Sequence, residues 1–236
     1  MGGSIKMVSL SEYLKGNTYP GRGILIGRTD GCSVAAYFIM GRSTNSRNRV
    51  FVTEEGGMRT KAFDESKVSD PSLIIYWPVR ELDGKLIVTN GDQTDTIYEF
   101  LKQGKSFTDA LRTREYEPDR PNYTPRISSL VEPDGSFEMS VLKNEGGEEG
   151  QCIREFFEYE APLDGHARII HTYEKDGNPL PPFVGEPRDF EISGDIDSFT
   201  DMLWNSLNED NKVSLYVRYT SLADGSCEVR IVNKNR

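Results

Sequence analysis

The chain has 236 residues, of which 36% are hydrophobic and 28% charged, and its formal net charge is -10 at pH 7. Sequence-independent nucleic-acid binding and binding to an anionic membrane surface both need a broad basic face, so this acidic balance argues against either partner. No apolar run approaches the ~20 residues of a membrane-spanning helix.

Residues 1–8 are expected to form a flexible leader, and residues 9–236 a single domain. A short helix is predicted over 9–15, where Ser9 and Glu12 have capping-box spacing. Hairpins are predicted at Asp30-Gly31 and Asp83-Gly84, which separate apolar runs. The strands predicted in this half are 22–28, 33–40, 49–53, 72–79 and 86–89. The run 72–79 is typical of a strand covered on both faces, with Pro78 near its end because proline cannot donate to a sheet ladder.

The second half begins with two predicted helices, 94–103 and one capped by Ser106 with Asp109 at its third position. A late helix is predicted over 199–207. The strands predicted here are 137–142, 152–159, 167–173, 213–220 and 227–232. This order of elements predicts an α+β fold or a layered α/β/β/α sandwich on mostly antiparallel sheet.

Cysteine and histidine usage argues against disulfides and metal. The chain has an odd number of cysteines without CxxC spacing, which suits buried thiols in a reducing compartment; they are Cys32, Cys152 and Cys227. His166 and His171 are the two histidines of the chain, and neither has a second histidine at metal-ligand spacing. The N-terminus lacks the apolar core of a signal peptide, so we expect a cytoplasmic protein.

Arginines concentrate between residues 22 and 49, where five arginines face one acid, Asp30. An apolar run ends at Gly41 and opens onto Arg42, Ser43 and Arg47. Guanidinium groups offer paired hydrogen bonds that match phosphate oxygens, so this stretch predicts a pocket for a small phosphorylated ligand. A polar hairpin loop with solvated arginines fits the pattern equally well.

Four other clusters can carry chemistry. The first is Tyr76 with Trp77 and Arg80, where the tyrosine could transfer a proton. The pattern alone favours a simpler structure, in which the two aromatic residues pack in the core beside the arginine. The second, TNGDQTD at 89–95, is more typical of a turn with a helix cap than of an anion site. The proline-rich stretch EPDRPNYTPRI at 117–127 predicts either a rigid loop that holds polar groups in fixed geometry or a plain connection. The fourth is His171, which is more typical of a strand residue with a hydrogen-bonded ring than of a catalytic base. The nearby residues 180–183 are expected to form a proline-stiffened loop that walls a pocket.

Several of these stretches resemble the motifs of the archaeal-type IMP cyclohydrolase family. The resemblance rests on YPGRGILIG at 19–27, GRSTNSRNRVF at 41–51, TNGDQTD at 89–95, EPDRPNYTPRI at 117–127 and TYEKDGNPLPPFVGEP at 172–187. It implies a four-layer αββα fold like that of the N-terminal-nucleophile (Ntn) hydrolases. It also implies a homo-oligomer that closes the ring of FAICAR (5-formamidoimidazole-4-carboxamide ribotide) to give IMP and water, without a cofactor.

The resemblance and the chemistry together suggest roles for individual residues. Ring closure needs the carboxamide nitrogen to attack the formyl carbon, whose oxygen then leaves as water. Tyr76 and Glu117 are the expected acid and base, with Arg126 setting their pKa values or polarising the formyl oxygen. The expected substrate-binding residues are Arg22, Arg42, Ser43, Arg47, Asn90, Gly91, Asn122 and Thr124.

Two alternatives remain open at this point. A non-catalytic purine-nucleotide sensor would keep the arginine pocket and lack turnover, although Tyr76, Glu117 and Arg126 argue against it. An Ntn-type amidohydrolase would cut itself before Cys32 and use the exposed thiol as its nucleophile. Asp30-Gly31-Cys32 already has an explanation as a β-turn.

Overall fold

The computed structural model describes residues 8–68 and 75–235, so the expected leader lies outside this range except for Val8. Within the described residues, the strands form two sheets in which all neighbouring strands run antiparallel. The six-stranded sheet, in the order β11-β10-β1-β2-β12-β13, contains β1 (Arg22–Thr29), β2 (Cys32–Met40), β10 (His166–His171), β11 (Arg188–Glu191), β12 (Lys212–Ser221) and β13 (Cys227–Asn233). The seven-stranded sheet, in the order β3 to β9, contains β3 (Arg49–Glu54), β4 (Gly57–Ala62), β5 (Val79–Leu82), β6 (Lys85–Thr89), β7 (Arg126–Val131), β8 (Phe137–Glu145) and β9 (Gln151–Tyr159).

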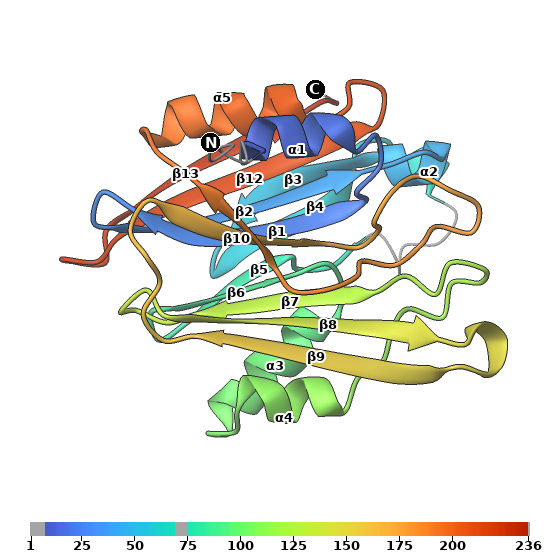
Figure 1. Cartoon of the computed structure of the whole chain (residues 1–236), viewed down its shortest axis with the longest axis horizontal. Helices are drawn as coiled ribbons and strands as arrows, with labels where there is room; N and C mark the ends of the chain where they lie inside the picture. The colour runs from blue at the N-terminus through green and yellow to red at the C-terminus, as the bar shows by residue number, and fades with distance from the viewer. Residues whose placement is uncertain (1–7, 69–74, 236) are drawn as a thin grey trace, which may run out of the picture.

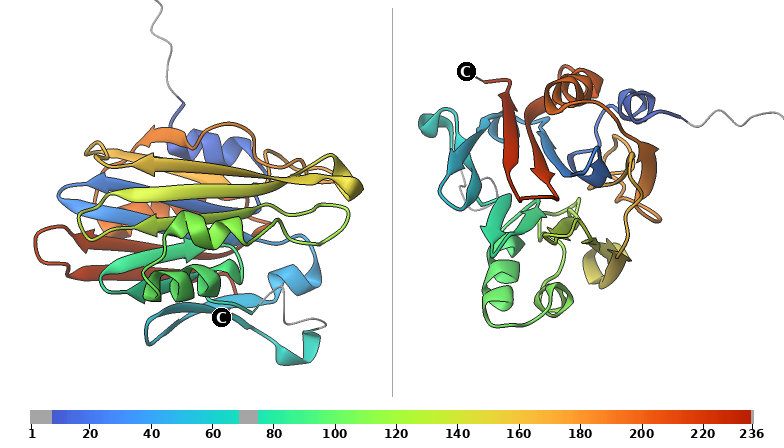
Figure 2. Two further views of the ribbon diagram at one scale, coloured as in Figure 1. Left: turned by 90° about the horizontal axis from the view of Figure 1, so that it is seen from below. Right: turned by 90° about the vertical axis from the view of Figure 1, so that its left-hand side faces the viewer.

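Two pairs of helices lie on opposite sides of the molecule (Figures 1 and 2). Helices α1 (Leu10–Gly16) and α5 (Ile196–Ser206) bury their apolar residues against the six-stranded sheet. Helices α3 (Gln93–Lys102) and α4 (Phe107–Arg112) do the same against the seven-stranded sheet. No helix in the described part of the chain is long and apolar enough to cross a membrane.

The two sheets bury a shared apolar cluster, with side chains such as Ile24, Tyr37 and Ile39 from one sheet and Val88 and Val141 from the other. In both sheets the residues alternate between this cluster and the helix-covered face, as the two-residue repeat of a strand requires. The fold is therefore α+β with two antiparallel sheets and few helices, which confirms the predicted fold class at this level.

Local turn and cap signals predicted several elements correctly. Asp30 and Gly31 adopt φ values of 50° and 74° in the β1–β2 turn, and Asp83 and Gly84 turn between β5 and β6 with φ values of 50° and 80°. Both pairs adopt the left-handed backbone that tight hairpin turns demand and that Asp and Gly tolerate. The predicted capping box at Ser9 is also confirmed, with Glu12 at its third position.

The strand predicted over 72–79 is wrong for residues 75–78 and right only for Val79, while residues 72–74 lie outside the described residues. Residues 75–78 are not strand, and β5 begins only after Pro78. The segment is held instead by single contacts: Tyr76 N–H donates to Thr60 Oγ1 at 2.9 Å, and the Pro78 carbonyl accepts from Thr89 N–H at 2.8 Å. Pro78 itself cannot donate, so the ladder starts with the next residue.

Other elements were missed. The strands β4 and β11 lie in polar stretches without clear apolar alternation. The arginine-rich loop contains a single helical turn, α2 (Thr44–Arg47), capped by Ser43. Short 3-10 turns, η1 (Glu65–Lys67) and η2 (Gly147–Glu149), were also not predicted. All three cysteines are free, but Cys32 and Cys152 are only half-buried and Cys227 is exposed, so the expectation of buried thiols is wrong.

His171 ends β10 as a fully buried residue with both ring nitrogens occupied. Its Nε2 lies 2.5 Å from Tyr13 Oη, and its Nδ1 lies 3.0 Å from the Tyr173 carbonyl oxygen. The carbonyl can only accept, so Nδ1 carries the proton and Nε2 accepts from the tyrosine. Burial lowers the pKa of His171 from 6.5 to about 3, and His171 therefore acts as a neutral strand residue, as predicted.

This burial predicts a pH-dependent stability. Below pH 6.5 the unfolded chain binds a proton at His171 that the folded chain excludes, so stability is full above that pH and is lost as pH falls toward 3. The residue is expected to contribute a slope of about 1.4 kcal/mol per pH unit in that window. Urea unfolding between pH 6 and 4 should show a smaller slope for His171→Gln. The control variant His166→Gln, on the same strand, should keep the wild-type slope because His171 remains. Equal slopes in the wild-type protein and both variants would contradict the role given to His171.

Candidate active site

Strand ends from both sheets meet at one end of the molecule. Arg22, the first residue of β1, pairs in register with Ile39 near the end of β2, and Gly23 pairs with His171 at the end of β10. In the other sheet, Thr89 at the end of β6 pairs with Ser128 near the start of β7. Antiparallel pairing thus puts the loops that precede β1 and β7 and follow β2, β6 and β10 at the same end.

A cavity of about 340 Å³ opens at this end. Six of the predicted site residues line it: Arg22, Arg42, Ser43, Glu117, Asn122 and Thr124. Leu180 also lines it, which confirms that the loop 180–183 walls a pocket. The lining residues without a predicted role include Tyr19, Arg49, Asp119 and Tyr173.

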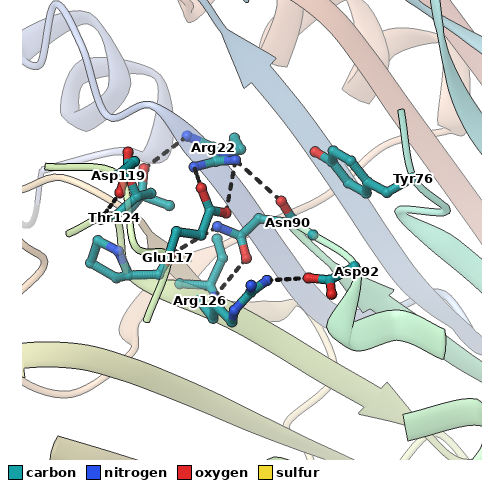
Figure 3. A network of polar contacts seen from close by, with 12 residues as sticks. Arg22, Tyr76, Asn90, Asp92, Glu117, Asp119, Thr124 and Arg126 are labelled. Atoms are coloured by element: carbon teal, nitrogen blue, oxygen red, sulfur yellow. Dashed lines mark hydrogen bonds and ion pairs between the residues drawn. The ribbon is translucent and has the colours of Figure 1, made fainter. Parts of the chain in front are cut away.

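Arg22 and Glu117 form the central ion pair of the site (Figure 3). Arg22 Nη1 lies 3.2 Å from Glu117 Oε1, and Nη2 donates to Oε2, also at 3.2 Å. The two side chains are only 11% and 7% exposed. Arg22 also donates to the Asn90 carbonyl oxygen at 3.2 Å, so the pair connects β1 with the loops that follow β6 and precede β7.

Arg126 lies on the seven-stranded sheet side of this pair. Its Nη1 lies 2.7 Å from Asp92 Oδ1 and donates to Gln93 Oε1 at 2.7 Å. A Cβ on Gly91 would lie 2.7 Å from that same Nη1, so only glycine lets the guanidinium approach this loop. Asn90 fixes the loop to β7, because its side chain donates to the Pro125 carbonyl and accepts from Ile127 N–H.

Burial and charge act in opposite directions on these groups. Burial raises the pKa of the Glu117 carboxyl above its ordinary value, although Arg22 and Arg126 oppose the shift. Burial lowers the pKa of Arg126, against the effect of Glu117 and Asp92. A carboxyl with a raised pKa beside cationic hydrogen-bond donors is suited to proton transfer near neutral pH.

Tyr76 lies near the site without lining the cavity. Its hydroxyl is 2.8 Å from the Tyr37 hydroxyl, and only 6% of the residue is exposed. Figure 3 shows its ring on the far side of Asn90 from Glu117. The geometry therefore brings Tyr76 to the edge of the site and leaves Glu117 in direct contact with the cavity.

The predicted arginines of the loop after β2 point in different directions. Arg42 lines the cavity, stacks 4.8 Å from the Tyr19 ring centroid and pairs with Asp176 at 2.5 Å. Arg47 points elsewhere: it is exposed and donates to the Gly41 carbonyl and to Asn211 Oδ1. The geometry therefore does not support Arg47 as a cavity residue.

Arg49 is the cavity arginine that sequence reasoning missed. The residue is only 4% exposed, and its guanidinium donates to the backbone carbonyls of Ser46 and Met40. It forms no ion pair with any residue in the described ranges 8–68 and 75–235. A signal was present, because Arg49 lies two residues before the buried Phe51 in a predicted strand and such residues share a face. A buried charge without a counter-charge is costly, so Arg49 favours an anion in the cavity.

No set of three or more His, Cys, Asp or Glu side chains in the described part of the chain is arranged to hold a metal ion.

Cys32 lies far from the cavity, because it begins β2 while Met40 ends it, and eight residue steps of strand span about 26 Å. The structure thus offers no support for the self-processing amidohydrolase. What the cavity does provide is a buried cation, Arg49, that has no ion-pair partner among the described residues, together with two carboxylates.

A family model described as IMP cyclohydrolase-like protein matches residues 19–225. The chain belongs to this family. Among curated relatives, the IMP cyclohydrolase of Methanopyrus kandleri is 31% identical over 160 residues, which cover 66% of this chain and 75% of the relative. The IMP cyclohydrolase of Methanocella arvoryzae is 30% identical over 162 residues, again 66% and 75% of the two chains. That of Methanosphaera stadtmanae is 30% identical over 160 residues, 66% and 74%. The span matched by the family model includes every residue that lines the cavity.

The buried ion pair predicts strong thermodynamic coupling. Arg22→Met leaves Glu117 buried without its main partner and should lower the free energy of unfolding by about 3–5 kcal/mol. Adding Glu117→Gln should restore part of the loss, so that the two changes together cost less than the sum of each alone. Urea unfolding of the wild-type protein, the two single variants and the double variant measures this coupling. Arg120→Met, which removes an exposed ion pair with Glu148, should cost less than about 1 kcal/mol; strictly additive costs at Arg22 and Glu117 would count against the coupling.

Proposed function

We propose that this chain is an IMP cyclohydrolase that converts FAICAR to IMP and water in purine biosynthesis. The observation that carries the proposal is the buried guanidinium of Arg49, which lines a cavity without a counter-charge among the described residues and suits the 5′-phosphate of a ribotide. Family membership, and relatives that are themselves named IMP cyclohydrolases, support the reaction.

The phosphate is proposed to bind at the end of the cavity formed by the loop after β2. Arg49 supplies the unpaired charge, Arg42 and Ser43 supply further donors, and Arg49 takes the role that sequence reasoning gave to Arg47. Arg42 contributes a partly exposed cation whose partner, Asp176, is also partly exposed. Replacing this surface ion pair by a contact to phosphate costs little, because such pairs are weak in water.

The reacting groups are proposed to lie beside the Arg22–Glu117 pair. The enzyme must hold the formamide against the carboxamide, and such orientation can contribute up to about 7–11 kcal/mol. Glu117 is the proposed proton carrier, with its pKa set by burial and by Arg22 and Arg126. Arg22 and Arg126 stabilise the oxyanion that forms on the formyl carbon. A positioned acid or base adds about 10²–10⁴-fold.

The remaining predicted residues are proposed to shape the site. Asn90 and Gly91 fix the loop that positions Arg126, while Asn122 and Thr124 orient the ribose or the carboxamide. Tyr76 is proposed to support the site from its edge. No cofactor is proposed: neither the attack nor the loss of water changes an oxidation state, so the reaction needs no redox cofactor.

We further propose the two finer features that the family resemblance implies, a four-layer αββα sandwich like that of the Ntn hydrolases and a homo-oligomer. From the sequence patterns we also propose a single domain over 9–236 and a cytoplasmic location. The apolar clusters between the sheets and under each pair of helices support the layered arrangement.

The phosphate assignment predicts a contrast between two nearby arginines. Arg49→Met should weaken IMP binding by about 100-fold or more, because a buried charge-assisted contact to phosphate is lost. Arg47→Met is the matched control and should change affinity by less than about threefold. Isothermal titration calorimetry with IMP, and with inosine as the ligand without phosphate, measures both. The assignment fails if Arg47→Met causes the larger loss, or if inosine binds as tightly as IMP.

The proton-transfer assignment predicts different results for two other variants. Glu117→Gln keeps the shape of the side chain but cannot carry a proton, so kcat for FAICAR should fall by about 10²–10⁴-fold. Tyr76→Phe should reduce kcat by no more than about tenfold, because its hydroxyl contacts Tyr37 and not the cavity. Steady-state kinetics followed by absorbance measures both. Near wild-type turnover of Glu117→Gln would show that another group carries the proton.

A further inference from the structure

Three side chains on the cavity wall form a short hydrogen-bond chain, and two of them, Asp119 and Tyr173, have no role in the reaction scheme described above. Asp119 Oδ2 lies 2.5 Å from Thr124 Oγ1, and Thr124 Oγ1 lies 2.5 Å from Tyr173 Oη. The Thr124 amide also donates to Asp119 Oδ1 at 2.6 Å. Asp119 and Thr124 belong to the loop before β7, seen in Figure 3, and Tyr173 follows β10. The chain therefore joins both sheets across the cavity wall.

The chemistry of the three groups fixes the direction of the chain. An ionised carboxylate can only accept hydrogen bonds, so Asp119 accepts from both the amide and the hydroxyl of Thr124. The single proton of Thr124 Oγ1 is then used, and this oxygen must accept from Tyr173. The Tyr173 proton therefore points along the wall to Thr124. Only lone pairs of Tyr173 Oη remain for a ligand in the cavity.

The tyrosine ring is held in one place. Tyr173 is 5% exposed, and its ring stacks on Tyr19 with centroids 5.9 Å apart and planes 14° apart. Gly21 lies against the ring with a φ of 78°, and a Cβ there would lie 2.6 Å from Tyr173 Cδ2. The ring thus has little room to turn its hydroxyl away from Thr124.

We propose that Tyr173 is a catalytic residue that accepts a hydrogen bond from an N–H group of the substrate, and that Thr124 and Asp119 are positioning residues that keep Tyr173 an acceptor. This inference rests on the proposed function, under which the N–H group belongs to the carboxamide that attacks the formyl carbon. Ring closure leaves that nitrogen as N1 of IMP with one hydrogen, so substrate and product present the same donor.

The chain also gives the proton of the attacking nitrogen a destination. As the N–C bond forms, the N–H bond breaks and its proton passes to Tyr173 Oη, while the Tyr173 proton passes to Thr124 and the Thr124 proton passes to Asp119. One proton leaves the substrate, one arrives on the Asp119 carboxylate, and both hydroxyls end neutral. Glu117, protonated at the start, gives its proton to the formyl oxyanion, takes the proton of the formamide nitrogen and gives it to the hydroxyl, which leaves as water as the C=N bond forms. Solvent then carries the proton from Asp119 back to Glu117.

Burial raises the pKa of Tyr173 to about 12, against the opposing effects of Arg22 and Thr124. The hydroxyl is therefore neutral at physiological pH and keeps its proton directed at Thr124.

Asp119→Asn tests the direction of the chain with little change of shape. The asparagine oxygen still accepts from the Thr124 amide, but its NH₂ group now faces Thr124 Oγ1 and donates to it. The Thr124 proton then turns to Tyr173, and the Tyr173 proton turns into the cavity. The variant should therefore present a donor where the wild-type protein presents an acceptor.

The readout is the ratio of two affinities, measured by isothermal titration calorimetry. IMP carries a hydrogen on N1, whereas purine riboside 5′-monophosphate has a bare N1. The wild-type protein should bind IMP at least tenfold more tightly, and Asp119→Asn should shrink this ratio by tenfold or more. Thr124→Val should also shrink it, and Thr124→Ser should keep it because the hydroxyl is restored. Tyr219→Phe, which removes a tyrosine hydroxyl bonded to the Gly194 carbonyl on another face, should leave it unchanged.

Turnover supplies the second readout. In Asp119→Asn, kcat for FAICAR should fall by about 100-fold or more, and the solvent deuterium isotope effect should lose its multi-proton character. A wild-type protein that discriminates between the two ligands without turning over FAICAR would contradict the proposed function and leave the hydrogen-bond assignment intact. The assignment is overturned if the affinity ratio is the same in the wild-type protein and Asp119→Asn. It is also overturned if the wild-type protein binds the two ligands equally well.

Discussion

The contact between Arg22 and Glu117 determines how the two sheets meet at the cavity. Arg22 comes from the six-stranded sheet, Glu117 from the loop that leads into the seven-stranded sheet, and both are almost fully buried. Each therefore depends on the other, because a buried charge without its partner is far less stable than the pair. The Asn90 carbonyl shares the same guanidinium, so a third segment is fixed by the same contact.

Charge is distributed unevenly around this pair. The chain as a whole is acidic, with a net charge of -10, yet Arg49 lines the cavity without a counter-charge in the described part of the chain. The same cavity is also lined by Glu117 and Asp119, whose carboxylates take part in defined hydrogen bonds. The cavity thus combines a group suited to hold an anion with groups suited to move protons. This combination is what a reaction on a phosphorylated ring precursor requires.

Sequence patterns predicted the elements whose signals are local. The Asp30-Gly31 turn and the capping boxes at Ser9 and Ser106 depend on a few adjacent residues, so they were found correctly. The strand predicted across Pro78 was wrong because an apolar run shows burial and not hydrogen bonding. Its neighbour β4, without apolar alternation, was missed.

The sequence predicted which loops form the site but not which of their side chains point into the cavity. Arg47 and Arg49 are two residues apart, and between them the helical turn α2 ends and β3 begins. Asn48 has φ -82° and ψ 48°, which belongs to neither element, so no periodic rule carries across it. The pairing of Asp119 with Tyr173 through Thr124 joins segments 49 residues apart and depends on tertiary structure alone.

The most direct test of this account is the conversion of FAICAR to IMP by the purified chain in the presence of a metal chelator, followed by absorbance. The account predicts turnover far above the uncatalysed rate, unaffected by the chelator, with IMP as the product. Tight binding of FAICAR or IMP without turnover would contradict the assignment as an enzyme and leave a nucleotide-binding protein. If the chain shows neither turnover nor binding, the assignment of the cavity as a nucleotide-binding site is itself contradicted.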